Sequence, residues 1–154
     1  MSFILLQASK EDKTAIENLM QFYIYDFTEF INYVIDKYKI KVYFVPFCIH
    51  KEAAFENDMI LANKIEQRLK NKDEFITLVP KSTKDLVDIF KRIDIFIGMR
   101  LHSLIFSTTN NIPSIGIAYA DKIKYTIKKN IKTLDLVDLS FKNLISEFES
   151  FRNQ

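Results

Sequence analysis

A short apolar segment runs into a polar one at Asp94-Ile-Phe-Ile-Gly-Met-Arg-Leu-His-Ser103. Its first four residues have the length and composition of a buried strand, and Gly98 interrupts them. A short helix is expected to follow over residues 100–109, ended by the pair Asn110-Asn111. The segment therefore predicts a strand, a turn at the glycine and a helix, which is the repeating unit of α/β proteins.

The same alternation continues on both sides of this segment. Because short, nearly all-apolar strands that alternate with helices form parallel sheets with helices on both faces, we expect an α/β fold. The prediction is a single Rossmann-like three-layer domain over residues 1–154, with about five parallel strands. Strands are expected at 3–8, 40–47, 75–79, 94–97 and 112–118, and further helices at about 16–35, 57–70, 82–93 and 140–151. The sequence between residue 118 and the last helix is interpreted as a basic stretch, without a strand.

Composition excludes several classes of protein. A chain of 154 residues fits one domain, and its net charge of +2 excludes a nucleic-acid binder that relies on bulk charge. The lone Cys48 excludes an internal disulfide, and with two histidines it cannot complete a Cys/His zinc cluster. We therefore expect no metal and no nucleic-acid partner. The sequence shows neither a run of eighteen apolar residues nor a basic-then-apolar leader, so a soluble, non-secreted protein is expected.

Glycine is unusually scarce in this sequence. At ordinary usage, a chain of this length would hold about eleven glycines, and this one has two, Gly98 and Gly116. Phosphate-binding loops built from bare backbone, such as the Walker A loop and the dinucleotide-binding fingerprint, are therefore excluded. A phosphorylated ligand would have to be held by side chains and helix ends.

The strand end at Gly98 gathers candidate ligand-binding residues. In open α/β sheets, ligands bind at the carboxyl ends of the strands, and a following helix offers free N–H groups there. Arg100 adds a guanidinium that can grip an anion with two hydrogen bonds, and His102 can exchange a proton near neutral pH. These residues predict an anion site with an acid or base beside it. A salt-bridged surface pair, or a buried histidine with satisfied hydrogen bonds, is the alternative interpretation.

The segment from Asp94 to Ser107, followed by Ile112-Pro-Ser-Ile-Gly-Ile-Ala-Tyr119 and Lys122, resembles the polysaccharide pyruvyl transferase family. In that family a strand ending in Gly-x-Arg-Leu-His-(Ser/Ala) precedes a helix, a proline-led strand and a Tyr-x-x-Lys motif. The resemblance is strongest over residues 85–125. The family has two domains in a glycosyltransferase-B-like (GT-B) fold, and the resemblance implies that this chain is the C-terminal half. The N-terminal domain that would close the cleft is then expected to be missing.

The resemblance also implies an activity. The family transfers a pyruvyl group from phosphoenolpyruvate to sugar hydroxyls as a ketal, with phosphoenolpyruvate as the donor substrate and no cofactor. The implied partners are a glycan or lipid-linked sugar acceptor and either the missing N-terminal domain or a second copy of the chain. The implied location is cytoplasmic, with peripheral association at the inner membrane face.

The family's Arg-Leu-His block contacts the donor, and this role carries over to Arg100, Leu101 and His102. Arg100 and His102 are the predicted catalytic residues, with His102 as the general acid or base. Ser103 is interpreted either as a helix cap or as a donor to the anion. Tyr119 and Lys122 are predicted to line the donor site, the alternative being a packed tyrosine and a solvated lysine.

Further features leave other functions open. Five lysines within residues 122–132 fit a solvated face or attraction to anionic lipid or to an acidic glycan carrier. The segment Glu11–Asp26 also resembles the opening helix of GNAT acetyltransferases, but the glycine-bearing loop that binds acetyl-CoA does not follow. The alternatives to a pyruvyl transferase are a non-catalytic anion-binding or assembly domain and one half of a nucleotide-sugar-dependent GT-B glycosyltransferase.

Overall fold

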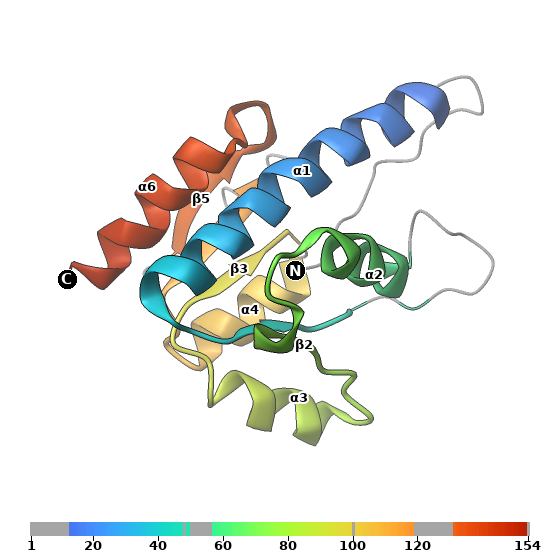
Figure 1. Cartoon of the computed structure of the whole chain (residues 1–154). Coiled ribbons are helices and arrows are strands. Elements are labelled where there is room, and N and C mark those ends of the chain that lie inside the picture. Colours follow the sequence, from blue (N-terminus) through green and yellow to red (C-terminus); the bar gives the residue numbers. More distant parts are fainter. Residues whose placement is uncertain (1–12, 48, 50–56, 100, 119–130, 154) are drawn as a thin grey trace. The chain divides into compact units, whose positions relative to one another are not determined.

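The structure is a computed structural model that describes residues 13–47, 49, 57–99, 101–118 and 131–153. The chain divides into two compact units, which we name the N-terminal unit (Phe3–Leu78) and the C-terminal unit (Val79–Gln154). Figure 1 labels the helices and strands of the chain. Each unit has its own parallel sheet and its own buried side chains. The chain is thus a mixed α/β protein, as the alternation of strands and helices predicts.

The N-terminal unit combines two helices with a two-stranded parallel sheet. Its elements are α1 (Lys13–Tyr38), β1 (Val42–Phe44), α2 (Asp58–Arg68), a short 3₁₀ helix (Lys72–Glu74) and β2 (Phe75–Thr77). β1 pairs with β2 so that Val42 lies opposite Phe75. The helices α1 and α2 pack against each other. The largest of the fully buried side chains in the unit come from both helices and from β1: Ile24, Phe27, Ile31, Val34, Phe44 and Ile65.

Local signals explain where these helices end. The backbone at Lys39 adopts a left-handed conformation with φ 53°, and its N–H donates to the Ile35 carbonyl at 3.0 Å, which stops α1. Asn57 caps α2 by accepting a hydrogen bond from the Met59 N–H at 3.0 Å. Asn32 on α1 accepts from the Lys70 N–H at 3.0 Å, which fixes the end of α2 to α1.

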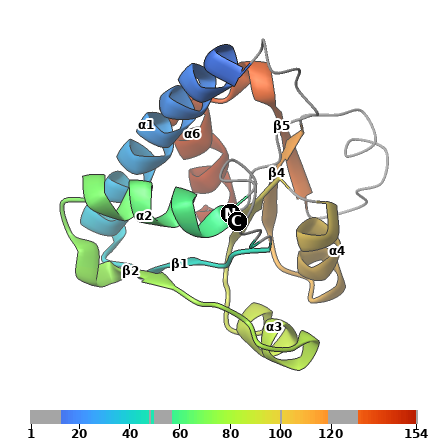
Figure 2. The same ribbon diagram turned by 90° about the vertical axis from the view of Figure 1, so that its right-hand side faces the viewer.

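The C-terminal unit contains a three-stranded parallel sheet in the order β3-β4-β5. Its helices α4 and α6 lie on opposite faces of this sheet (Figure 2). The unit therefore has the helix–sheet–helix layering that the sequence predicts. Its elements are α3 (Thr83–Phe90), β3 (Phe96–Gly98), α4 (Leu101–Thr109), β4 (Ser114–Ala118), β5 (Ile131–Asp135), a 3₁₀ helix (Leu136–Asp138) and α6 (Phe141–Arg152).

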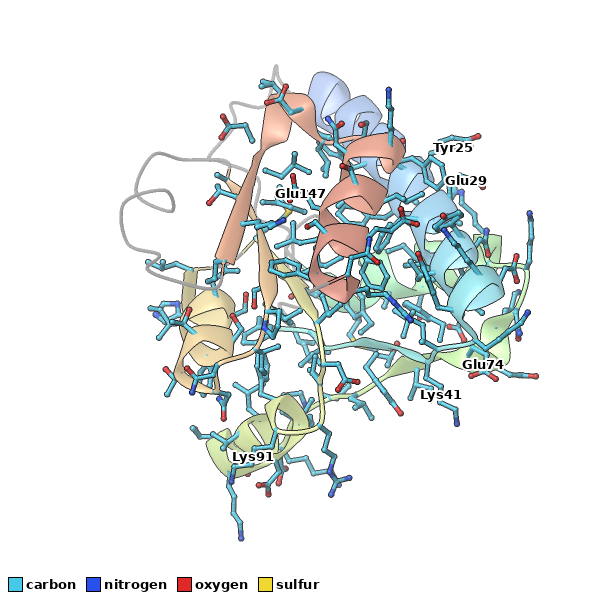
Figure 3. All side chains as sticks on the ribbon, turned by 90° about the vertical axis from the view of Figure 1, so that its left-hand side faces the viewer. Tyr25, Glu29, Lys41, Glu74, Lys91 and Glu147 are labelled. Atoms are coloured by element: carbon cyan, nitrogen blue, oxygen red, sulfur yellow. The ribbon has the colours of Figure 1, made fainter. Side chains whose placement is uncertain are left out.

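One lysine fixes α6 to the edge strand β5. The Lys132 Nζ lies 3.4 Å from the Glu147 Oε2, hydrogen-bonds to the Ser150 hydroxyl and lies 5.0 Å from the centre of the Phe151 ring. Figure 3 labels Glu147 where α6 faces β5. Lys132 belongs to the lysine-rich stretch that the sequence suggests is a solvated face. In the structure, this lysine is instead a packing residue whose side chain is about one-third exposed.

The end of α4 is defined by a paired hydrogen-bond motif. Asn111 is left-handed with φ 55°, and its N–H donates to the Thr108 carbonyl at 3.0 Å. The Ile112 N–H donates to the Ser107 carbonyl at 2.9 Å. This pair of bonds is the Schellman arrangement, in which a left-handed residue satisfies the last carbonyls of a helix. The helix end predicted at Asn110-Asn111 is thereby confirmed.

Two predictions about the sheet need correction or stay open. The interpretation of the sequence after residue 118 as containing no strand is wrong, because Ile131–Asp135 forms β5. The sequence of β5 lacks the apolar run typical of a buried strand, because β5 is an edge strand in which only Leu134 is buried. Within the described residues, five strands form two separate sheets, so a single five-stranded sheet is not confirmed. The strand expected at 3–8 lies outside the described residues.

Candidate functional site

The candidate site lies at the carboxyl edge of the C-terminal sheet. Because β3, β4 and β5 are parallel, their carboxyl ends share this edge. β3 ends at Gly98, which lies opposite Gly116, and β4 continues to Ala118, opposite Asp135. The sequence places Arg100 two residues after the first of these ends and Tyr119 directly after the second. The topology thus brings the two predicted segments to one edge.

The junction between β3 and α4 is short and closely packed. Only two residues separate Gly98 from Leu101, the first residue of α4, and one of them, Met99, is buried. Ser103, in the first turn of α4, is fully buried. A β-carbon built on Gly98 would lie 2.9 Å from the Ser103 hydroxyl oxygen. The first turn of α4 therefore lies against the backbone at the end of β3.

His102 and Ser103 have opposite environments although they are adjacent. His102 is exposed and Leu101 is half-buried, whereas the Ser103 side chain has no exposed surface. An exposed histidine in the first turn of a helix is accessible to a ligand that binds the free N–H groups there. The alternative interpretation of a buried, satisfied histidine is therefore wrong for His102. Arg100, Tyr119 and Lys122 lie outside the described residues, and their roles stay predictions.

One titratable group of the N-terminal unit has a shifted pKa. Burial raises the pKa of the Tyr23 hydroxyl on α1 above its ordinary value of 10.0. Within the described ranges, no group of three or more His, Cys, Asp or Glu side chains is arranged to hold a metal ion. In the same part of the chain, no helix is long and apolar enough to cross a membrane.

A buried carboxylate occupies the corresponding position in the N-terminal unit. Asp58 begins α2, is 2 % exposed, and its Oδ2 accepts a hydrogen bond from the Phe47 N–H at 2.8 Å. Phe47 lies three residues beyond the carboxyl end of β1. The pair Asn57-Asp58 in the sequence fits either a helix cap or a cleft residue at Asp58, and Asn57 does supply the cap. No sequence signal identifies Asp58 as the residue that fixes the chain after β1. His50, the other histidine, lies outside the described residues.

The fold and the site together define an α/β protein whose candidate residues follow the carboxyl ends of parallel strands. Comparison with known protein families shows the family to which this chain belongs. The sequence model of the family described as polysaccharide pyruvyl transferase matches residues 10–121, well over half of the chain. The chain belongs to this family, whose members are transferases of polysaccharide biosynthesis. No curated protein and no solved structure matches it.

The family match covers most of the predicted site. It runs from the segment before α1 through β4, so it includes Arg100, His102 and Tyr119, whereas Lys122 directly follows its last residue. It also includes the segment Glu11–Asp26, which resembles an acetyltransferase helix. That segment therefore belongs to the matched region and requires no second family to explain it.

Proposed function

We propose that this chain binds phosphoenolpyruvate and takes part in transferring its pyruvyl group to a sugar of a cell-surface polysaccharide. The observation that carries the proposal is the family match over a segment in which His102 is exposed at the carboxyl end of a parallel strand. Phosphoenolpyruvate carries a carboxylate and a phosphate close together, so it needs cations and N–H donors. Arg100, with the N–H groups at the start of α4, would supply them, and Lys122 would add a second cation.

The reaction requires protons to move at defined atoms. The methylene carbon C3 of phosphoenolpyruvate gains a proton, and positive charge develops at C2. A sugar hydroxyl adds to C2 and loses its proton, the C2–O bond to phosphate breaks, and a second hydroxyl of the sugar adds to C2. Of the two hydroxyl protons, one balances the proton taken up at C3, and the other leaves with inorganic phosphate. His102 would act as the general acid–base group, worth roughly 10²–10⁴-fold in rate.

The remaining parts of the proposal concern context. We place Leu101 and Tyr119 in the wall of the donor site and treat the C-terminal unit as part of one half of a GT-B-like enzyme. The acceptor would be a glycan or a lipid-linked sugar, bound with help from a further domain or a second copy. Because phosphoenolpyruvate is a cytoplasmic metabolite, the protein would act in the cytoplasm, and a lipid-linked acceptor would bring it to the inner membrane face.

Thermal unfolding with three ligands tests the donor. A ligand that binds only the folded state stabilises it by about 2.7 kcal/mol at a concentration one hundred times its Kd. Phosphoenolpyruvate is expected to raise the melting temperature, whereas inorganic phosphate and a UDP-sugar at the same concentration are not. Stabilisation by the UDP-sugar alone would favour a glycosyltransferase half. No response to any of the three would favour an assembly role, and either result overturns the proposal.

Matched substitutions test the residues. Arg100→Lys is expected to weaken phosphoenolpyruvate binding about tenfold, because an ammonium cannot form the two parallel hydrogen bonds of a guanidinium. With a sugar acceptor that the wild type turns over, His102→Gln is expected to abolish the pH dependence of the turnover rate. The controls are Arg92→Lys, at an exposed arginine of the same unit, and His50→Gln, at the only other histidine. Equal effects of a site variant and its control would remove the assigned role.

A further inference from the structure

The only two glycines of the chain lie directly opposite each other in the sheet. Gly98 on β3 is the register partner of Gly116 on β4, which in turn pairs with Thr133 on β5. Register partners in a parallel sheet present their side chains to the same face. One row across the sheet, at the carboxyl end of β3 and the middle of β4 and β5, therefore has no side chain at two of its three positions.

Backbone conformation does not explain this use of glycine. Neither Gly98 nor Gly116 has a positive φ, the conformation for which glycine is usually required. The two left-handed positions of the described chain are instead occupied by Lys39 and Asn111. At Gly98, the relevant property is thus the absence of a β-carbon and not conformational freedom.

The space beside Gly98 is filled from two directions. A β-carbon there would meet the Phe96 Cε1 at 2.5 Å and Cζ at 2.8 Å, and the Ser103 hydroxyl oxygen at 2.9 Å. Phe96 cannot move aside freely, because it is 5 % exposed and its ring centre lies 5.0 Å from that of the fully buried Phe90. Phe90 in turn contacts Phe106 on α4, with ring centres 5.9 Å apart. Besides this ring cluster, the Ser103 hydroxyl on the first turn of α4 is the group that would have to move.

We propose that Gly98 and Ser103 are positioning residues: their contact sets where the first turn of α4 lies on the sheet. His102 is in that turn, and Arg100 is in the two-residue connection before it. The inference rests on the proposed function, since it concerns how these two residues meet the donor. It also gives Ser103 a role different from binding the anion. Its side chain acts by packing against Gly98, and its hydroxyl does not contact phosphoenolpyruvate.

Two substitutions separate packing from ligand binding. Gly98→Ala is expected to weaken phosphoenolpyruvate binding by about tenfold or more, because small displacements of catalytic groups have large effects. Adding Ser103→Ala to Gly98→Ala removes the hydroxyl that the new β-carbon would meet, so the double variant should bind phosphoenolpyruvate more tightly than Gly98→Ala alone. The matched control is Ser107→Ala, the same change at an equally buried serine one turn further along α4, whose hydroxyl donates to the Leu104 carbonyl at 2.8 Å.

A second variant covers the case in which Gly98→Ala does not fold, as judged by far-UV circular dichroism. Ser103→Thr adds one methyl group on the helix side of the same contact, and Ser107→Thr is its control. We expect Ser103→Thr to weaken phosphoenolpyruvate binding at least threefold more than Ser107→Thr, about half the logarithmic effect of Gly98→Ala. Binding is measured by calorimetric titration of the full chain with phosphoenolpyruvate.

The outcomes distinguish the two levels of the argument. A wild-type chain that does not bind phosphoenolpyruvate overturns the proposed function, and the inference with it. A wild type that binds, together with folded Gly98→Ala or Ser103→Thr variants that bind equally well, overturns the inference alone. So does a Gly98→Ala/Ser103→Ala variant that binds phosphoenolpyruvate no more tightly than Gly98→Ala, because the Ser103 hydroxyl would then not be what places the first turn of α4.

Discussion

Replacing Asp58 by alanine should destabilise the N-terminal unit more than removing the helix cap beside it. The Asp58 carboxylate is 2 % exposed, and it accepts the Phe47 N–H at 2.8 Å from the first turn of α2. Two favourable interactions therefore meet at one side chain. One is a hydrogen bond to an ionised acceptor, and the other is a negative charge at the positive end of a helix dipole.

The expected magnitude follows from these two interactions. A hydrogen bond to a charged group contributes about 1.5–3 kcal/mol, and a charge at a helix N-terminus adds about 0.3–1 kcal/mol. The Asp58→Ala variant should therefore lose about 2–4 kcal/mol of unfolding free energy. Asp58→Asn keeps an acceptor for the Phe47 N–H and should lose only about 1 kcal/mol. Asn57→Ala, which removes the bond to the Met59 N–H, should also lose about 1 kcal/mol.

Urea denaturation followed by far-UV circular dichroism measures these differences. With an m value of about 2 kcal/mol/M, Asp58→Ala should lower the urea midpoint by about 1–2 M. The control is Asp36→Ala, at an exposed aspartate of α1, which should change the unfolding free energy by less than about 0.5 kcal/mol. If Asp58→Ala proved no more destabilising than Asn57→Ala, the carboxylate would not be fixing the chain after β1, and the reasoning would be refuted.

Three further predictions concern other contacts. Lys39→Gly should raise the unfolding free energy by about 0.5–1 kcal/mol, because glycine relieves the strain of the left-handed conformation. Asn111→Gly should raise it by less, because asparagine tolerates that conformation. A larger gain for Asn111→Gly in thermal melts would contradict this. Lys132→Met should lower the unfolding free energy by about 0.5–1.5 kcal/mol at low salt, because it removes the partner of Glu147. The difference in unfolding free energy between variant and wild type should shrink near 1 M salt. A difference that does not change with salt would rule out an electrostatic contact. Burial raises the pKa of Tyr23, so the unfolded chain loses the hydroxyl proton before the folded chain does as the pH rises above 10.0. The free energy of unfolding should therefore fall above this pH, and it should fall less in the Tyr23→Phe variant. Urea denaturation at about pH 9 and about pH 11 makes the comparison.

Helix ends were predictable from sequence wherever a local side chain supplies the cap. Ser82 accepts the Asp85 N–H at 3.1 Å and Ser140 accepts the Asn143 N–H at 3.2 Å, and both helices begin where the sequence places them. These interactions span three residues, so the sequence contains everything needed to recognise them. The same holds for the end of α4 at Asn111.

The strand β5 was not predictable for the opposite reason. What makes Lys132 part of a strand is its contact with Glu147 and its pairing with Ile115, fifteen and seventeen residues away. A lysine in a lysine-rich stretch gives no local indication of such partners. Edge strands depend on pairing and packing that local propensity does not record.

The candidate site divides in the same way. Its residue types, order and location at a strand end were predictable, because a strand followed by Gly-x-Arg-Leu-His is a local pattern that also carries the family resemblance. The environments of His102 and Ser103 were not, since neighbouring residues on a helix point about 100° apart and only the tertiary fold decides which one is buried. The sequence therefore identified the segment and left the roles of its side chains open.

The scarcity of glycine supports a stronger conclusion than the exclusion of phosphate loops. In a chain that places lysine and asparagine at its left-handed positions, glycine is not reserved for backbone conformation. Its two occurrences coincide in one row of one sheet, although only the sheet register reveals that Gly98 and Gly116 are neighbours. At Gly98, the Phe96 ring and the Ser103 hydroxyl of α4 lie where they would meet a β-carbon. In this protein, bare backbone at the candidate site therefore brings a helix with its side chains close to the strand end, whereas glycine-rich phosphate-binding loops bring the backbone itself close to the ligand.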